Sequence, residues 1–129
     1  AIALNGEVVQ EIPNLVVTAG KNFVASRMKD TTKAAMTHMA IGTNNTTAAV
    51  GQTALSAEVT RGALTSTTVS TNTIAYVETF AAGTGTGAIV EAGVFNASSS
   101  GDMLCRTVFA VVNKGSADAM TITWTITVS

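Results

Sequence analysis

The chain has 129 residues and a mass of 13.1 kDa, which is the size of one domain with one core. Seven Lys and Arg residues against eight Asp and Glu residues leave a formal charge of −1, so there is no basic excess to bind nucleic acid or an anionic membrane surface. The longest apolar run, Val108 to Val112, is far shorter than the roughly 20 residues of a membrane-spanning helix.

Charged residues make up only 12% of the chain, about half of the roughly 25% that is typical of soluble domains. Threonine, alanine and valine dominate with 22, 21 and 15 copies, and the β-branched residues among them favour strands. Because charge keeps a free surface from associating, we expect a β-rich subunit that hides much of its surface against other subunits. A monomer kept soluble by threonine hydroxyls is the alternative.

Residues 1–17 place apolar side chains around the only proline, Pro13, which cannot donate a backbone hydrogen bond to a sheet. This pattern predicts an extended arm that adds to a strand or groove of a partner. Four apolar side chains of the arm are its predicted contact residues: Ile2, Leu4, Val8 and Val9. Removing residues 1–12 is then expected to leave the domain folded but unable to attach or to oligomerise.

A helical pattern follows the arm. Ala19, Phe23 and Arg27 recur at a spacing of four, which predicts one short helix over residues 19–29. Thr18 is placed to cap its N-terminus, and cationic residues in the last turn suit the negative pole of the helix dipole. We expect this helix to lie over a sheet.

The rest of the chain alternates between strand patterns and turns. Strands are predicted over residues 35–43, 61–69, 72–81, 88–96, 103–112 and 120–128. Residues 43–53 show no period and predict a surface loop. The glycine-rich residues 83–87 predict a hairpin turn and not a phosphate-binding loop, because a strand pattern follows them and no lysine is present.

Alternation is strictest in the last strand, where every second residue from Thr121 to Thr127 is threonine and the residues between them are apolar. One face therefore belongs to the core and the other bears hydroxyls. The predicted core includes Ile122, Trp124, Ile126, Phe95 and Phe109. Short turns and a single helix predict an all-β domain over residues 1–129, an antiparallel β-sandwich of about seven or eight strands. Jelly-roll-like and immunoglobulin-like connectivity both fit.

Side chains suited to catalysis are scarce. His38 is the only histidine, and its apolar strand pattern is typical of a buried or interfacial side chain. Cys105, the only cysteine, has apolar neighbours and is predicted to be a core residue. A zinc site needs about four Cys, His or carboxylate ligands. We therefore expect no enzymatic activity, no bound metal and no cofactor.

Three charged residues lie inside otherwise apolar strand patterns: Glu78, Glu91 and Arg106. Charges in such positions are usually paired across neighbouring strands, because an unpaired buried charge is costly. We expect one of the two carboxylates to form a structural ion pair with Arg106, and Glu91 is the preferred candidate.

Several segments of the sequence are similar, in their residue types and in their order along the chain, to segments of a known class of protein. In the C-terminal half they are residues 89–97 (Ile-Val-Glu-Ala-Gly-Val-Phe-Asn-Ala), residues 98–109 and residues 121–126 (Thr-Ile-Thr-Trp-Thr-Ile). Upstream they are residues 14–22, 36–43 and 53–61. Together they resemble small virion structural proteins of tailed bacteriophages, over most of residues 14–127. The resemblance implies a β-sandwich without enzymatic activity.

Within this resemblance, a short chain that carries its own N-terminal arm and has no coiled-coil or collagen-like shaft favours a capsid cement or decoration protein. Such a protein is expected on the capsid surface of the virion, bound to the major capsid protein as a homodimer or homotrimer, after synthesis in the bacterial host cytoplasm. Loop tips near residues 44–52 and 97–101 are expected to add contacts. The alternative is a tail or tail-fibre component that binds a host receptor or glycan.

Overall fold

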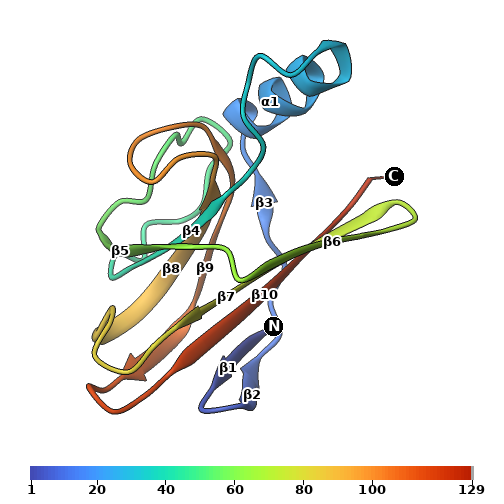
Figure 1. The fold of residues 1–129 in the computed structure, drawn as a ribbon. Coiled ribbons are helices and arrows are strands. Elements are labelled where there is room, and N and C mark those ends of the chain that lie inside the picture. Colours follow the sequence, from blue (N-terminus) through green and yellow to red (C-terminus); the bar gives the residue numbers. More distant parts are fainter. Residues whose placement is uncertain (129) are drawn as a thin grey trace.

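Two antiparallel sheets pack face to face in the computed structural model, which describes residues 1–128 (Figure 1). Sheet A has the strand order β2 (Glu7–Gln10), β1 (Ile2–Leu4), β10 (Met120–Thr127), β7 (Thr73–Phe80) and β6 (Ser66–Ser70). Sheet B has the order β3 (Leu15–Val16), β9 (Met103–Lys114), β8 (Gly87–Phe95), β4 (His38–Gly42) and β5 (Glu58–Ala63). The predicted antiparallel β-sandwich is confirmed, but its described residues form ten strands, five in each sheet, where about seven or eight were predicted, because residues 1–17 form three short strands and residues 61–69 divide between two.

The alternation in β10 turns its apolar side chains toward sheet B. Ile122 and Trp124 are buried, while the threonines between them belong to the other face of the strand. Trp124 lies opposite Tyr76 of β7, and both side chains belong to the core between the sheets. Ile126 is only partly buried and packs at the margin of that core.

Sheet B is covered on both faces. Val94 and Phe109 point into the core between the sheets. Phe95 follows Val94 and therefore points to the outer face, where it packs with Leu55 from the segment that connects β4 to β5. Phe95 and Phe109, which the sequence analysis places in one core, thus lie in two apolar clusters on opposite faces of sheet B.

The N-terminal segment is not a free arm. β1 pairs with β10, with Ile2 opposite Ile122, and the chain then turns back into β2. Gly6 in that turn has a φ of +83°, a conformation that favours glycine. The remaining residues of the segment cross to sheet B, where β3 pairs with β9. The apolar pattern that predicted an arm reflects pairing within the protein's own sheets.

Helix α1 (Thr18–Lys29) covers one end of the sandwich (Figure 1). Its bounds agree with the predicted helix over 19–29 to within one residue, but the predicted cap is wrong: Val17 is the N-cap and no side chain bonds there. Gly20 lies so close to the backbone of β9 that a Cβ atom at this position would collide with it. This glycine therefore lets the helix pack directly on sheet B.

The predicted strand over residues 61–69 is two strands that belong to different sheets. β5 ends and β6 begins on either side of Leu64 and Thr65. The N–H of Leu64 donates to the carbonyl of Thr37, next to β4, at 2.9 Å, and the N–H of Thr65 donates to Val77 of β7 at 2.7 Å. Successive residues thus bond to opposite sheets, and a continuous β-favouring sequence gives no sign of this crossing.

Candidate functional site

Two of the four predicted contact residues are open to a partner. Val8 and Val9 are 58% and 47% exposed on β2, the outer strand of sheet A. Ile2 is only 2% exposed and belongs to the core, and Leu4 packs against this core, because β1 lies between β2 and β10 in the sheet. The expectation that residues 1–12 can be removed from a stable domain is therefore corrected: their loss would take Ile2 out of the core and uncover the edge of β10.

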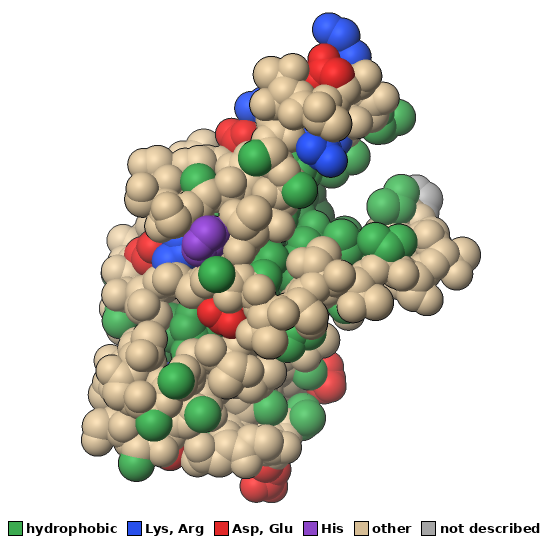
Figure 2. All heavy atoms as spheres, in the orientation of Figure 1, with side chains coloured by type: hydrophobic (Ala, Val, Ile, Leu, Met, Phe, Trp, Pro, Cys, Tyr) green, Lys and Arg blue, Asp and Glu red, His purple; other side chains and the backbone are tan. Residues whose placement is uncertain are grey.

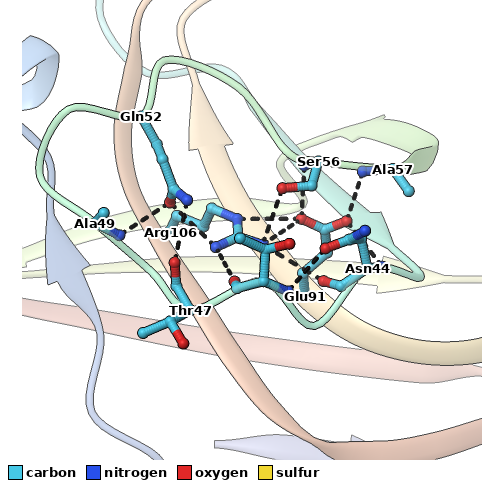
Figure 3. Close-up of polar contacts among 9 residues, drawn as sticks. Asn44, Thr47, Ala49, Gln52, Ser56, Ala57, Glu91 and Arg106 are labelled. Atoms are coloured by element: carbon cyan, nitrogen blue, oxygen red, sulfur yellow. Dashed lines mark hydrogen bonds and ion pairs between the residues drawn. The ribbon is translucent and has the colours of Figure 1, made fainter.

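A buried ion pair lies on the outer face of sheet B (Figure 3). Arg106 of β9 donates from Nη2 and Nε to Oε1 of Glu91 on β8, at 2.9 and 3.1 Å. Both side chains are 0% exposed. Residues 43–57, here termed the anchored loop, provide the other bonds to this pair. The structure thus joins the two charged residues that the sequence singles out.

Glu91 binds the anchored loop through three backbone N–H groups. Ser56 donates to Oε1 at 2.9 Å, and Asn44 and Ala57 donate to Oε2 at 3.1 and 2.8 Å. Together with the two bonds from Arg106, five N–H donors converge on one carboxylate. These bonds replace the water that the carboxylate would otherwise bind, which makes burial of the charge tolerable.

Arg106 binds the opposite part of the anchored loop. Its Nη1 donates to the carbonyl of Thr46 at 2.8 Å and to Oε1 of Gln52 at 3.1 Å. Gln52 also accepts from the N–H of Ala49 at 3.0 Å and donates to the carbonyl of Thr47 at 3.1 Å. The segment that the sequence predicts as a surface loop is therefore bound to the outer face of sheet B by hydrogen bonds along its length.

Gly42, at the start of this connection, makes room for the ion pair. A Cβ atom at Gly42 would lie 2.5 Å from the carbonyl oxygen of Ala57 and 2.5 Å from Oε2 of Glu91. Both oxygens are held by hydrogen bonds, because the carbonyl of Ala57 accepts from the N–H of Thr43 at 3.0 Å and Oε2 accepts from the N–H groups of Asn44 and Ala57. The sequence analysis predicted the ion pair but not its contacts with the anchored loop. Most loop atoms that bind the ion pair are backbone groups, which every residue carries, so no residue pattern reveals them.

A second anchor was missed by the sequence analysis. Arg61 donates from Nε and Nη2 to both carboxylate oxygens of Glu58, at 3.0 and 2.7 Å, and its guanidinium carbon lies 3.7 Å from the ring centre of Phe95. Nη1 donates to the carbonyls of Ala97 and Ser100 at 3.1 and 2.8 Å. Arg61 therefore fixes the turn between β8 and β9, which the sequence predicted as a contact loop.

Two features hid this pair from the sequence analysis: the predicted strand begins at residue 61 and so excludes Glu58, and β5 contains a β-bulge. Residues three apart on a regular strand point to opposite faces, so Glu58 and Arg61 show no pairing signal as a strand pattern. The register against β4 shifts between Thr60 and Glu58. The extra residue returns Glu58 and Arg61 to the same face, where they pair.

Glu78, the other candidate carboxylate, does not meet Arg106 because β7 belongs to sheet A. It accepts from Oγ1 of Thr65 at 2.8 Å and from the N–H of Thr79 at 2.9 Å. A Cβ atom at Gly62 would collide with its carboxylate. Glu78 therefore stabilises the point where the chain crosses between the sheets.

The titratable side chains weighed for catalysis occupy different surroundings. Cys105 is buried in the core, and burial raises the pKa of its thiol well above the usual range, so the reactive thiolate is not formed at neutral pH. Burial, followed by the nearby Cys105, raises the pKa of Tyr76 to about 12. His38 is half-buried, and its Nδ1 lies 2.8 Å from Oγ1 of Thr37.

Within residues 1–128, no three His, Cys, Asp or Glu side chains come together as a metal ion would require. No helix in the same part of the chain is long and apolar enough to cross a membrane. No protein-family model, curated protein or solved structure matches this chain.

Proposed function

We propose that this protein is a non-enzymatic virion structural protein of the capsid cement or decoration type, which binds the outside of an assembled phage head. The class of protein is supported by the resemblance of residues 14–127 to such proteins. The contact surface is supported by the anchored loop, because residues 43–57 contain no charged residue and a buried ion pair holds them in place. A loop that is ordered before contact loses little conformational entropy on binding. A ligand that binds only the assembled lattice stabilises that lattice by its free energy of binding.

The proposed shell contact is the region where the anchored loop meets the N-terminal segment. A shallow hollow of about 430 Å³ lies between Asn45 and Thr47 of the loop and Pro13 and Asn14. Val50 at the loop tip is 49% exposed. Figure 2 shows that Lys and Arg side chains on the face in view gather mainly around α1, while Asp and Glu side chains are spread over it. The anchored loop itself contributes no charged side chain. Uncharged surface of this kind favours association over free diffusion.

The proposed contact between copies is the outer edge of β6. All five residues from Ser66 to Ser70 are exposed, none is charged, and no other strand pairs with this edge in sheet A. An unprotected edge strand is a template for pairing with another strand. Two copies related by a two-fold axis can bring the same edge together in antiparallel orientation, which completes a closed dimer.

Binding to heads assembled without this protein tests the shell contact. We expect Ala49→Asp, at an exposed position of the anchored loop, to lower the affinity for such heads by about tenfold or more, which corresponds to about 1.4 kcal/mol. Ala82→Asp is the matched control, an exposed alanine in the turn before β8, and is expected to bind as the parent chain does. Equal binding by both variants would refute the assigned contact.

Sedimentation tests the contact between copies. We expect the parent chain to form dimers and Thr68→Lys, which puts a charge in the middle of β6, to remain monomeric. Thr68→Ser keeps an uncharged hydroxyl and is expected to dimerise. A monomeric parent chain, or a dimeric lysine variant, would show that β6 is not the interface.

A further inference from the structure

The exposed positive charge of this protein gathers at one end of the sandwich. Four of the seven Lys and Arg residues lie between residues 21 and 33, in α1 and the turn that follows it, where Asp30 is the only acid. The other three are buried or nearly so and bond within the fold: Arg61, Arg106 and Lys114. Figure 2 shows Lys and Arg side chains around α1 and, at the opposite end of the face in view, acidic side chains without a Lys or Arg beside them.

The outer face of α1 combines these cations with apolar side chains. Phe23 is buried beneath the helix, whereas Val24 is 43% and Met28 84% exposed. Lys21, Val24 and Met28 are three and four residues apart, which places them along one side of the helix. Exposed methionine is common at surfaces that bind other proteins. The basic patch is defined here as Lys21, Val24, Met28 and Lys29.

A patch of opposite charge lies at the other end, on β2 and the turns beside it (Figure 1). Val8 and Val9, two of the predicted contact residues, are 58% and 47% exposed on the outer strand of sheet A, and the exposed Glu7 precedes them. Oδ1 of Asp118 accepts from Nδ2 of Asn5 at 2.9 Å, which places this carboxylate beside the same hairpin. The acidic patch is defined here as Glu7, Val8, Val9 and Asp118.

The negative charge of this patch has no exposed cation beside it to neutralise it. The hydrogen bond from Asn5 is the main cause that holds the pKa of Asp118 below its ordinary value, so its carboxylate is ionised at neutral pH. Lys114 lies near Asp118, but it is 1% exposed and its Nζ donates to the carbonyl of Ala81 at 2.9 Å. The basic patch is at the opposite end of the same chain (Figure 1). Only a separate molecule can therefore bring a basic patch to an acidic one.

We propose that the basic patch of one copy binds the acidic patch of a second copy, so that copies join end to end. Each patch has two exposed apolar side chains flanked by charges, and the two sets of charges are opposite in sign, an arrangement that favours association and fixes its orientation. Pairing of β2 with β2 of another copy would instead bring like charges together.

This contact joins two different surfaces, so each copy keeps one patch free and further copies can add to form rows or rings. It goes beyond the proposed function and does not rest on it, because no residue of either patch belongs to the anchored loop or to β6.

Sedimentation equilibrium of the Thr68→Lys chain, in which the proposed β6 contact is blocked, tests this association. Because exposed ion pairs contribute little, we expect a dissociation constant on the order of 0.1–1 mM at about 20 mM salt. Raising the salt to about 0.3 M is expected to weaken the association at least about fivefold, since salt screens exposed charges. Absence of association up to about 1 mM protein at low salt would overturn the proposal.

Two single substitutions at exposed positions disable one patch each, Met28→Glu and Val8→Lys, both made in the Thr68→Lys chain. We expect each variant alone to associate at least about tenfold more weakly, because the new charge faces like charges of the intact patch. An equimolar mixture is expected to associate again, since each variant supplies the patch that the other lacks. Val59→Lys, on β5 at the outer edge of sheet B, is the matched control and is expected to associate as the Thr68→Lys chain does.

The proposal is also overturned if either variant alone associates as the Thr68→Lys chain does, or if the mixture associates no more than the separate variants. A contact between two identical surfaces would give the second result, because mixing then restores no intact pair. A surviving β6 dimer would appear equally in every variant and in the mixture. The measurements use free protein, so a failure of the proposed shell contact would leave their outcome unaffected.

Discussion

Replacement of Glu91 by glutamine tests whether the buried ion pair holds the fold and the anchored loop. The change keeps the size of the side chain but removes its charge and one of its two acceptor oxygens. Three donors converge on Oε1 and two on Oε2, so at least two buried N–H groups lose their acceptor and the Arg106 guanidinium is left without a counter-charge. Breaking a buried pair from one side costs about 3–5 kcal/mol.

We therefore expect Glu91→Gln to lower the free energy of unfolding by about 3–5 kcal/mol, a large part of the 5–15 kcal/mol typical of a domain. Urea denaturation followed by fluorescence of the single tryptophan measures it. Glu58→Gln is the matched control: its pair with Arg61 is partly exposed, with Glu58 32% accessible, and such pairs contribute about 0–1 kcal/mol. A loss below about 1 kcal/mol in Glu91→Gln would refute the reasoning.

Three further predictions concern single residues. Trp124→Ala removes a large buried aromatic side chain and is expected to cost about 3–5 kcal/mol in calorimetry; an unchanged melting temperature would contradict its place in the core. Gly42→Ala is expected to destabilise the fold by more than about 1 kcal/mol, because the added Cβ would collide with the carbonyl oxygen of Ala57 and with Oε2 of Glu91. An unchanged melting temperature in the same assay would show that the loop can move away. Tyr76, the only tyrosine, is expected to titrate near pH 12 in an absorbance titration. Since burial disfavours tyrosinate, the stability of the folded state is unaffected below about pH 10 and falls as the pH rises toward about 12; titration near 10 would contradict its burial.

The sequence predicted those features that depend on side-chain pattern alone. Alternation of apolar residues with threonine identified β10 and the burial of Trp124, because the period of a strand is set by local geometry. Charges inside apolar strands indicated the pair of Glu91 with Arg106, since such charges are rarely left alone. The helix followed from a spacing of four residues.

Other features depend on partners that are distant in the chain, which a local pattern does not reveal. The apolar pattern around Ile2 fits a strand in the protein's own sheet as well as an arm on a partner, and the structure has the former. The crossing at Leu64 is decided by which backbone groups lie nearby in space. The anchored loop is held mostly through backbone atoms, and the pairing of Arg61 with Glu58 depends on a bulge.

Location and copy number in the virion test the proposed function most directly. The proposed function predicts that a cryo-electron microscopy reconstruction of virions that contain this chain shows the sandwich at many equivalent positions on the outer surface of the head, with residues 43–57 toward the shell. Density for this chain at the tail tip, with none on the head, would contradict the proposed function and support the receptor-binding alternative.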